Sequence, residues 1–107
     1  MLISKNLSDF TRGWVVGDFK PSLFQSKDVE IGLHYYREGE DHPAHYHREV
    51  TEYNVVISGV ATVNGATFVA SDIFIIEKGE VTEIEFLTDT YILCIKTPSV
   101  PGDKVLV

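Results

Sequence analysis

The sequence predicts a single all-β domain, folded as an antiparallel sandwich or barrel. The chain has 107 residues, which is the size of one compact domain. Apolar and polar residues alternate along most of it, and no stretch keeps the spacing of an amphipathic helix. Turn signals recur every few to a dozen residues, at positions 39, 59, 64–65, 71–72, 78–79 and 88–89. This spacing is typical of short antiparallel strands.

The expected strands follow one another from residue 29 onward. The first, "VEIGLHYYRE", is rich in β-branched and aromatic residues, which favour strands. The segments "TEYNVVISG" and "VATVNG" come next and meet at Gly59. Asn64–Gly65 then predicts a tight hairpin turn, because both residues tolerate a positive φ. The remaining strand segments are "ATFVA", "DIFIIEKG", "VTEIEFLTD" and "TYILCIKT".

We divide the single domain, 1–107, into three parts. Residues 29–97 form the predicted barrel core. Residues 1–28 contain a short strand, and we expect Trp14, Phe19 and Phe24 either to cover one end of the barrel or to join a subunit interface. Residues 98–107 carry two prolines and a glycine, so they predict an extended tail that ends in an edge strand.

Composition excludes several classes of function. The formal net charge is −7 and no basic cluster occurs, so binding to nucleic acid is not expected. The longest unbroken apolar run, Tyr91–Ile95, is far shorter than a membrane span. The first ten residues lack the apolar stretch of a signal peptide, and we therefore expect a cytoplasmic protein.

The stretch "GEDHPAHYHREVTEYNVVISG", residues 39–59, holds the residues that predict chemistry. His45 and His47 project from the same face if this segment is a strand. A short turn after His47 would bring Glu52 beside them. Two imidazoles and a carboxylate suit a divalent transition metal such as Zn, Fe, Mn, Ni or Co. From the spacing alone, histidines exposed at a strand end remain the alternative.

Four other residues bear on the interior. Asn54 shares the face of Glu52 and is expected to be a polar contact in the pocket. His34 either lines the lumen or points at solvent or into a satisfied hydrogen bond, and we favour the second alternative. His42 is expected in a loop at the mouth of the pocket. Cys94, the single cysteine, excludes an intrachain disulfide and is expected to be a small buried apolar residue.

The same stretch resembles the first conserved motif of the cupin superfamily, G(x)5HxH(x)3–4E(x)6G. Gly39 and Gly59 match its two glycines. His45, His47 and Glu52 match its metal ligands. The resemblance implies an antiparallel double-stranded β-helix, or jelly-roll barrel, with a metal site in the lumen.

The second cupin motif, G(x)5PxG(x)2H(x)3N, matches poorly. Gly79 agrees, but Thr82 stands where the family has its fourth ligand, a histidine, and Phe86 stands in place of the asparagine. The site then holds metal through three residues, or is completed by Thr82 or a water molecule, or has lost its metal. Alternation places Ile84 on the face of Thr82, and Glu83 on the opposite face.

The resemblance also implies two classes of function. Small cupins include dioxygenases, isomerases, epimerases and decarboxylases, so we expect a metal-dependent enzyme, such as a dioxygenase or isomerase, that acts on a small organic molecule. The alternative is a non-catalytic barrel that binds a sugar or small acid with weak or no metal. A homodimer is expected in either case, because cupin barrels often pair through their sheets.

Overall fold

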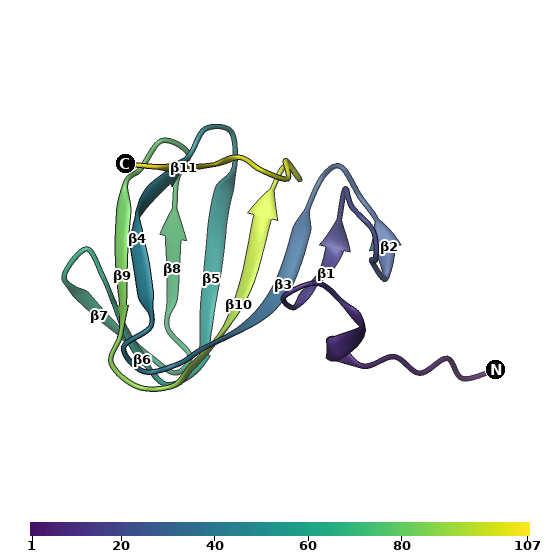
Figure 1. Cartoon of the computed structure of the whole chain (residues 1–107), viewed down its shortest axis with the longest axis horizontal. Coiled ribbons are helices and arrows are strands. Elements are labelled where there is room, and N and C mark those ends of the chain that lie inside the picture. The colour runs from purple at the N-terminus through teal and green to yellow at the C-terminus, as the bar shows by residue number, and fades with distance from the viewer.

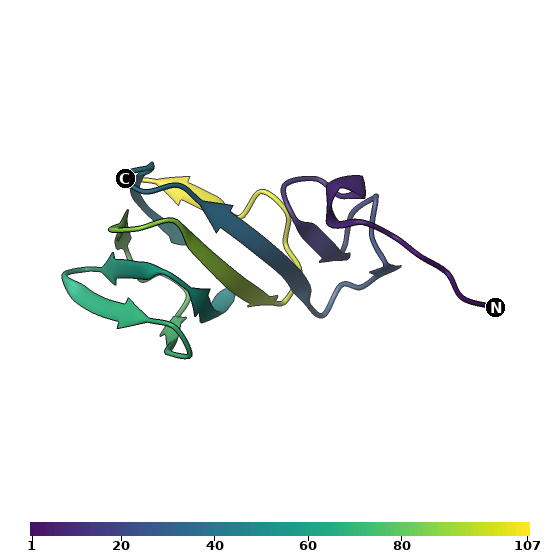
Figure 2. The ribbon, with the colours of Figure 1, turned by 90° about the horizontal axis from the view of Figure 1, so that it is seen from below.

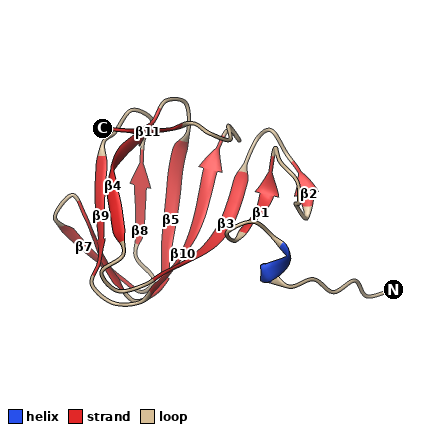
Figure 3. Ribbon diagram, viewed as in Figure 1, coloured by secondary structure: helices blue, strands red, loops and turns tan.

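The computed structural model describes all 107 residues and confirms the all-β fold class. It contains eleven strands, and its only helical element is the three-residue 3-10 turn Leu7–Asp9, η1 (Figure 3). The strands are β1 (Trp14–Gly17), β2 (Phe24–Gln25), β3 (Glu30–Tyr36), β4 (Asp41–His47), β5 (Thr51–Ser58), β6 (Val60–Val63), β7 (Ala66–Val69), β8 (Ile73–Ile76), β9 (Thr82–Phe86), β10 (Thr90–Thr97) and β11 (Lys104–Leu106). No helix has the length and apolar composition needed to cross a membrane.

Two sheets form the walls of a barrel (Figures 1 and 2). The larger sheet has the order β2-β1-β3-β10-β5-β8, and the smaller one has the order β11-β4-β9-β6-β7. All neighbouring strands are antiparallel except β1 and β2. From β3 onward the chain alternates between the two sheets, except at the hairpin of β6 and β7, as in a double-stranded β-helix.

The predicted hairpin at Asn64–Gly65 joins β6 to β7. Its two residues have φ values of 49° and 83°, the left-handed conformation that a two-residue turn of this kind requires. The flanking residues Val63 and Ala66 pair directly, so the turn has no extra residue. Local turn chemistry thus sets the register of this edge of the smaller sheet.

An irregularity in β4 corrects the expected place of His42. The register between β4 and β9 shifts between His42 and His45, and Pro43 lies inside this bulge. Proline is tolerated there because the ladder does not need its missing N–H group. His42 is consequently a strand residue and not a loop residue. The extra residue also turns His42 toward the interior, together with His45 and His47.

One half of the interior is an apolar core. Its seven buried members come from five strands and belong to both sheets: Val56, Ala61, Val63, Phe74, Ile76, Phe86 and Ile92. Burying each larger side chain contributes about 1.5–3 kcal/mol relative to leaving it exposed. The other half of the interior carries buried polar side chains, so the barrel is closed by packing at one end only.

The two ends of the chain frame the polar half. Strand β1 extends the larger sheet beyond β3, and Trp14 and Phe19 line the interior, whereas Phe24 is exposed on the edge strand β2. At the other end, β11 pairs with β4 and covers its edge. Residues before η1 run away from the barrel as an extended arm (Figure 1).

Gly59, between β5 and β6, has no space for a side chain. Its φ is 95°, and a Cβ there would lie 2.3 Å from the carbonyl oxygen of Asp89 and 2.5 Å from Thr90 Oγ1. Gly79 has a similar φ of 82° with nothing within 4 Å, so it is a matched control. We expect Gly79→Ala to cost about 1–2 kcal/mol from backbone strain. Gly59→Ala should cost a further ~1–3 kcal/mol from overpacking, measured by urea unfolding. Equal losses would show that the close approach has no energetic weight.

Candidate metal centre

His45 and His47 are the two buried imidazoles of β4. Their residues are 7% and 4% exposed, and their ring centroids lie 5.4 Å apart with the planes nearly perpendicular, at 84°. Both rings line the interior because alternate residues of a strand point to the same side. The predicted pairing of these two side chains on one face is therefore present in the structure.

The tautomer of His45 is set by the bulge that precedes it. Its Nδ1 lies 3.1 Å from the carbonyl oxygen of Pro43, so Nδ1–H donates and Nε2 keeps a free lone pair. Burial lowers the pKa of His45, and the nearby charge of Lys104 adds to this, although the hydrogen bond to Pro43 opposes it. A neutral imidazole with a free Nε2 is the form that binds a metal ion.

The turn between β4 and β5 places Glu52 next to His47. Asp103 holds this turn, because its Oδ2 accepts hydrogen bonds from the backbone N–H groups of Glu49 and Val50, at 2.9 and 3.1 Å. Asp103 is itself buried, at 8% exposure. A residue some fifty positions later in the chain thus fixes the spacing of the two ligand-bearing strands, and no local sequence pattern predicts this role.

Glu52 is a largely buried carboxylate with several polar neighbours. Its Oε2 lies 3.4 Å from His47 Nε2, and its Oε1 accepts a hydrogen bond from Cys94 Sγ at 3.1 Å. Burial alone raises the pKa of Glu52, but His47, the Lys96 ammonium and the Cys94 thiol together lower it to about 2. Glu52 is thus a ready anionic ligand at neutral pH.

Cys94 is buried, as expected, but it is more than an apolar filler. It faces the interior and its thiol donates to Glu52. Burial raises the pKa of Cys94, and the negative charge of Glu52 raises it further, so the thiol stays protonated as a donor. Alternation along "TYILCIKT" places Cys94 and Lys96 on the same face of the strand as the buried Ile92. This pattern could have indicated from the sequence that both residues face the interior.

His34 lines the cavity and also makes a hydrogen bond, so of the favoured alternative the hydrogen bond is present and the solvent-facing orientation is not. Its Nδ1–H donates to the carbonyl oxygen of Arg12 at 2.9 Å, and its ring meets that of Trp14 edge-on, with 4.4 Å between centroids. Gly32 makes room for the ring, since a Cβ there would lie 2.6 Å from His34 Nε2. That Nε2 is buried without a hydrogen-bond partner. Burial lowers the pKa of His34, so its Nε2 is an acceptor.

The polar half of the barrel opens into a cavity of about 1050 Å³. His34, His45, His47, Glu52 and Asn54 all line it. Its apolar wall includes Tyr36, Ile84, Phe86 and Ile92.

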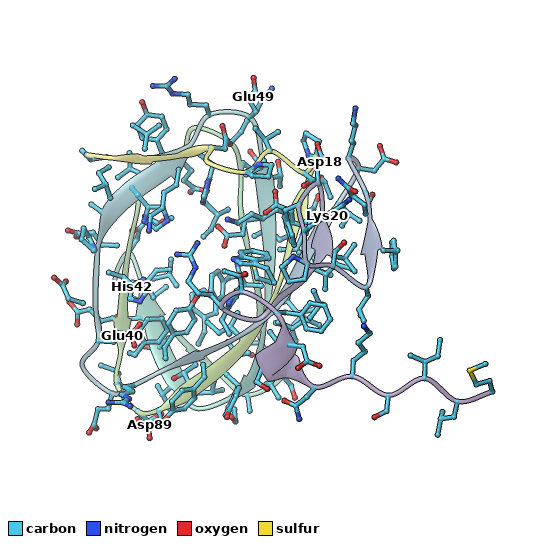
Figure 4. All side chains as sticks on the ribbon, turned by 45° about the vertical axis from the view of Figure 1, so that its right-hand side comes forward. Asp18, Lys20, Glu40, His42, Glu49 and Asp89 are labelled. Carbon is cyan, nitrogen blue, oxygen red and sulfur yellow. The ribbon has the colours of Figure 1, made fainter.

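Side chains near the opposite side of the cavity form a second polar group. His42 Nε2 lies 2.6 Å from Glu40 Oε2, and the two side chains sit next to each other in Figure 4. The His42 ring also packs edge-on against Tyr36 and Phe86, at 4.9 and 5.2 Å between centroids. His42 therefore binds Glu40 and packs against two residues of the apolar wall.

The structure resembles known double-stranded β-helix proteins. An uncharacterised conserved protein with such a domain from Klebsiella pneumoniae aligns with a TM-score of 0.68 at 22% identity, over 79% of either chain. A cupin superfamily protein from Desulfitobacterium hafniense aligns with a TM-score of 0.62 at 22% identity, over 70% of this chain and 72% of that one. The chain has the cupin fold.

A third cupin-like neighbour was solved with a metal. The bacterial pirin YhhW from Escherichia coli, in complex with nickel(II), aligns with a TM-score of 0.66 at 20% identity. The alignment covers 82% of this chain but only 39% of the pirin. No family model matches the sequence, and no curated protein is significantly similar to it.

The donor set of this cupin barrel fits a metal ion in part. Bonds of about 2.0–2.2 Å place two donor atoms of a tetrahedral site about 3.4 Å apart. The 3.4 Å between His47 Nε2 and Glu52 Oε2 agrees with that value. However, no three His, Cys, Asp or Glu side chains converge closely enough to hold an ion as they stand.

Thr82 occupies the position of the usual cupin histidine and offers no ring nitrogen. It is 2% exposed and pairs with His45 across β4 and β9. Thr82 borders a separate small cavity of about 240 Å³ and does not line the large one. Ile84 shares its inward face, while Glu83 is exposed, as alternation predicts. No acidic residue of β9 therefore replaces the missing ligand.

The depressed pKa of Glu52 has a consequence for acid stability. A carboxylate whose pKa is lower in the folded protein stabilises it fully above its unfolded pKa, near 4.5, and loses this contribution as the pH falls toward 2. We expect the difference in unfolding free energy between wild type and Glu52→Gln, both without metal, to be largest above pH 4.5 and to shrink below it. Urea unfolding across this range measures it. A difference that does not change with pH would contradict the lowered pKa.

Proposed function

We propose that this chain binds a divalent transition metal, one of Zn, Fe, Mn, Ni or Co, through His45, His47 and Glu52. The approach of His47 to Glu52 at 3.4 Å, beside a cavity of about 1050 Å³, carries the proposal. The Nε2 of His45 is also free for an ion. The bacterial pirin, a neighbour of the same fold, was solved in complex with nickel(II), which supports metal binding by this chain.

The proposed activity is that of a metal-dependent enzyme, such as a dioxygenase or isomerase, on a small organic molecule. A metal with two imidazole ligands and one carboxylate keeps open positions, and when bound it supplies a Lewis acid or a centre for oxygen chemistry. The chain's own residues would orient the molecule. Asn54 and His34 have buried polar atoms that could form hydrogen bonds with the molecule, and the apolar wall would exclude water from it.

Tyr36 offers a further hydroxyl within this wall. It stacks on Phe86 at 4.3 Å between ring centroids, and burial raises its pKa, with the negative charge of Glu52 adding to the effect. The hydroxyl therefore stays protonated at neutral pH. It is suited to donate a hydrogen bond to a bound molecule rather than to act as a base.

A barrel that binds a small molecule without turnover is the second candidate. It is favoured by Thr82, which leaves the site with three ligands and does not face the large cavity. Turnover of any substrate by the wild type, lost in His47→Ala, would exclude this candidate.

Metal content tests the proposed ligands directly. We expect wild type purified without chelator to hold about one equivalent of metal, and His45→Ala and His47→Ala to lose most of it, roughly a tenfold drop or more. His42→Ala is the control, because His42 binds Glu40 and is outside the proposed ligand set. Elemental analysis by mass spectrometry gives the readout. Equal metal in all four proteins would refute the proposed site.

We also propose a homodimer that forms through the outer face of the larger sheet. Exposed apolar side chains gather on this face from four neighbouring strands: Tyr35, Tyr53, Ile57, Ile73, Ile75 and Tyr91. The outward residues between them are also apolar: Ile31, Leu33, Val55, Leu93 and Ile95. A continuous apolar sheet face on a chain of net charge −7 is typical of a surface that packs on a second sheet.

A charge within this face should dissociate the dimer. Ile75 is 54% exposed and pairs with Tyr53, so Ile75→Glu would bury an unpaired carboxylate at the interface. We expect wild type to scatter as twice 12.0 kDa and Ile75→Glu to weaken association by roughly 100-fold. Val81→Glu, at a similarly exposed position outside this face, is the control and should remain dimeric. A wild-type mass of 12.0 kDa would refute the dimer.

A further inference from the structure

The cavity has an unusual balance of charge. Four of the nine Lys and Arg residues line it, but only four of the sixteen Asp and Glu residues do. The cations are Arg12, Lys20, Lys96 and Lys104, and the acids are Glu30, Glu40, Glu52 and Asp103. The residues that border the cavity are therefore neutral in sum, and the rest of the chain carries the formal charge of −7. Of the four cations only Lys96 is partly buried, and the other three are exposed.

The acids and the cations of the cavity differ in their partners. Every one of the four acids accepts a hydrogen bond: Glu30 from Ser99, Glu40 from His42, Glu52 from Cys94, and Asp103 from two backbone N–H groups. None of the four cations has a carboxylate oxygen within 4.0 Å. None of these cations thus forms a close ion pair with the protein, although Lys96 acts on Glu52 at longer range.

Lys96 is the one partly buried cation of the four, and it lies between Glu30 and Glu52 in its row of the larger sheet. It pairs with Glu52 across β10 and β5, and its Nζ lies 4.8 Å from the centroid of the Trp14 ring. The next pair of the same ladder is Cys94 with Asn54. Lys96 and Asn54 are therefore diagonal neighbours on the inner face, about 7–8 Å apart at the backbone, a span that a lysine side chain covers.

Asn54 provides a second donor at this place. Asn54 is 4% exposed and its Nδ2 is buried without a hydrogen-bond partner, although it lines the cavity. A buried amide that lacks a partner destabilises the protein, so a bound acceptor would recover this loss. An ammonium and an amide N–H that both need an acceptor define an anion site.

We infer that the cavity binds a small organic acid, whose carboxylate is held by Lys96 and Asn54 beside the metal ligand Glu52. The inference names the ligand class of the function proposed above and rests on it for the position of the metal. The apolar wall formed by Tyr36, Ile84, Phe86 and Ile92 would hold the carbon skeleton of the acid.

The surroundings favour a carboxylate over a phosphate. Phosphate sites use the N-terminus of a helix or a glycine-rich loop to supply several backbone donors. This chain has no helix beyond the three-residue turn Leu7–Asp9, and its cavity is lined by strand side chains. One ammonium and one amide match the two oxygens of a carboxylate.

The chain carries its own reporter for this site. Trp14 is the only tryptophan, it lines the cavity, and it touches Lys96. We would titrate wild type with malonate, succinate and isobutyrate and follow Trp14 fluorescence. The corresponding amides, which have the same shape without the charge, are the matched probes. We expect saturable binding of at least one acid and of none of the amides.

Variants assign the binding to Lys96. Lys96→Met keeps the packing on Trp14 but removes the charge, and it should weaken acid binding by roughly 10- to 100-fold. Lys78→Met, at an exposed lysine outside the cavity, should bind as wild type does. Binding of no acid, or equal binding by Lys96→Met and wild type, would overturn the inference.

Metal analysis of the same samples separates this inference from the proposed function. A metal-loaded wild type that binds none of the acids would refute the acid site and leave the metal site standing. A wild type that is purified without chelator, holds no metal and still binds an acid through Lys96 would support the acid site and refute the metal site.

Discussion

The buried carboxylate of Glu52 is the constraint around which the polar half of the barrel is organised. A buried ionised carboxylate is strongly unfavourable unless charges and donors surround it. Here His47, Cys94 and Lys96 supply them, from β4 and β10 on either side. Their combined effect outweighs burial and keeps the acid ionised. A metal ion would add a further positive partner at the same carboxylate, so the apo arrangement and a loaded one would use the same residues.

The register of strands β3, β10 and β5 brings the polar residues of the cavity side by side. On the inner face of the larger sheet, Glu30, Lys96 and Glu52 form one row across β3, β10 and β5, and Gly32, Cys94 and Asn54 form the next. Gly32 is the one position in these rows without a side chain, and the His34 ring folds over it. A shift of any strand by one residue would turn its members of the rows outward, so pairing of the β-ladder and formation of the cavity depend on each other.

Much of this arrangement can be read from the sequence, because it depends on period-two alternation. The fold class, the turn at Asn64–Gly65 and the inward faces of His45 and His47 follow from local patterns. The place of His42 does not, because a bulge reverses the alternation and nothing local fixes where the register shifts. The role of Asp103 is equally hidden, since it depends on how the last residues cross back over the β4–β5 turn. Properties that arise from one strand are predictable here, and those that arise from distant segments are not.

The replacement of a histidine by Thr82 changes which wall of the barrel can complete the proposed metal site. A fourth imidazole would come from β9, next to His45. Thr82 is buried and does not line the large cavity, so β9 supplies no ligand on that side. On the facing strands β5 and β10, the amide of Asn54 has no hydrogen-bond partner and Lys96 makes no close ion pair. His45, His47 and Glu52 would hold the ion, and Lys96 is the cross-strand neighbour of Glu52. A ligand that carries both a metal-binding oxygen and a negative charge would therefore suit both parts of the site.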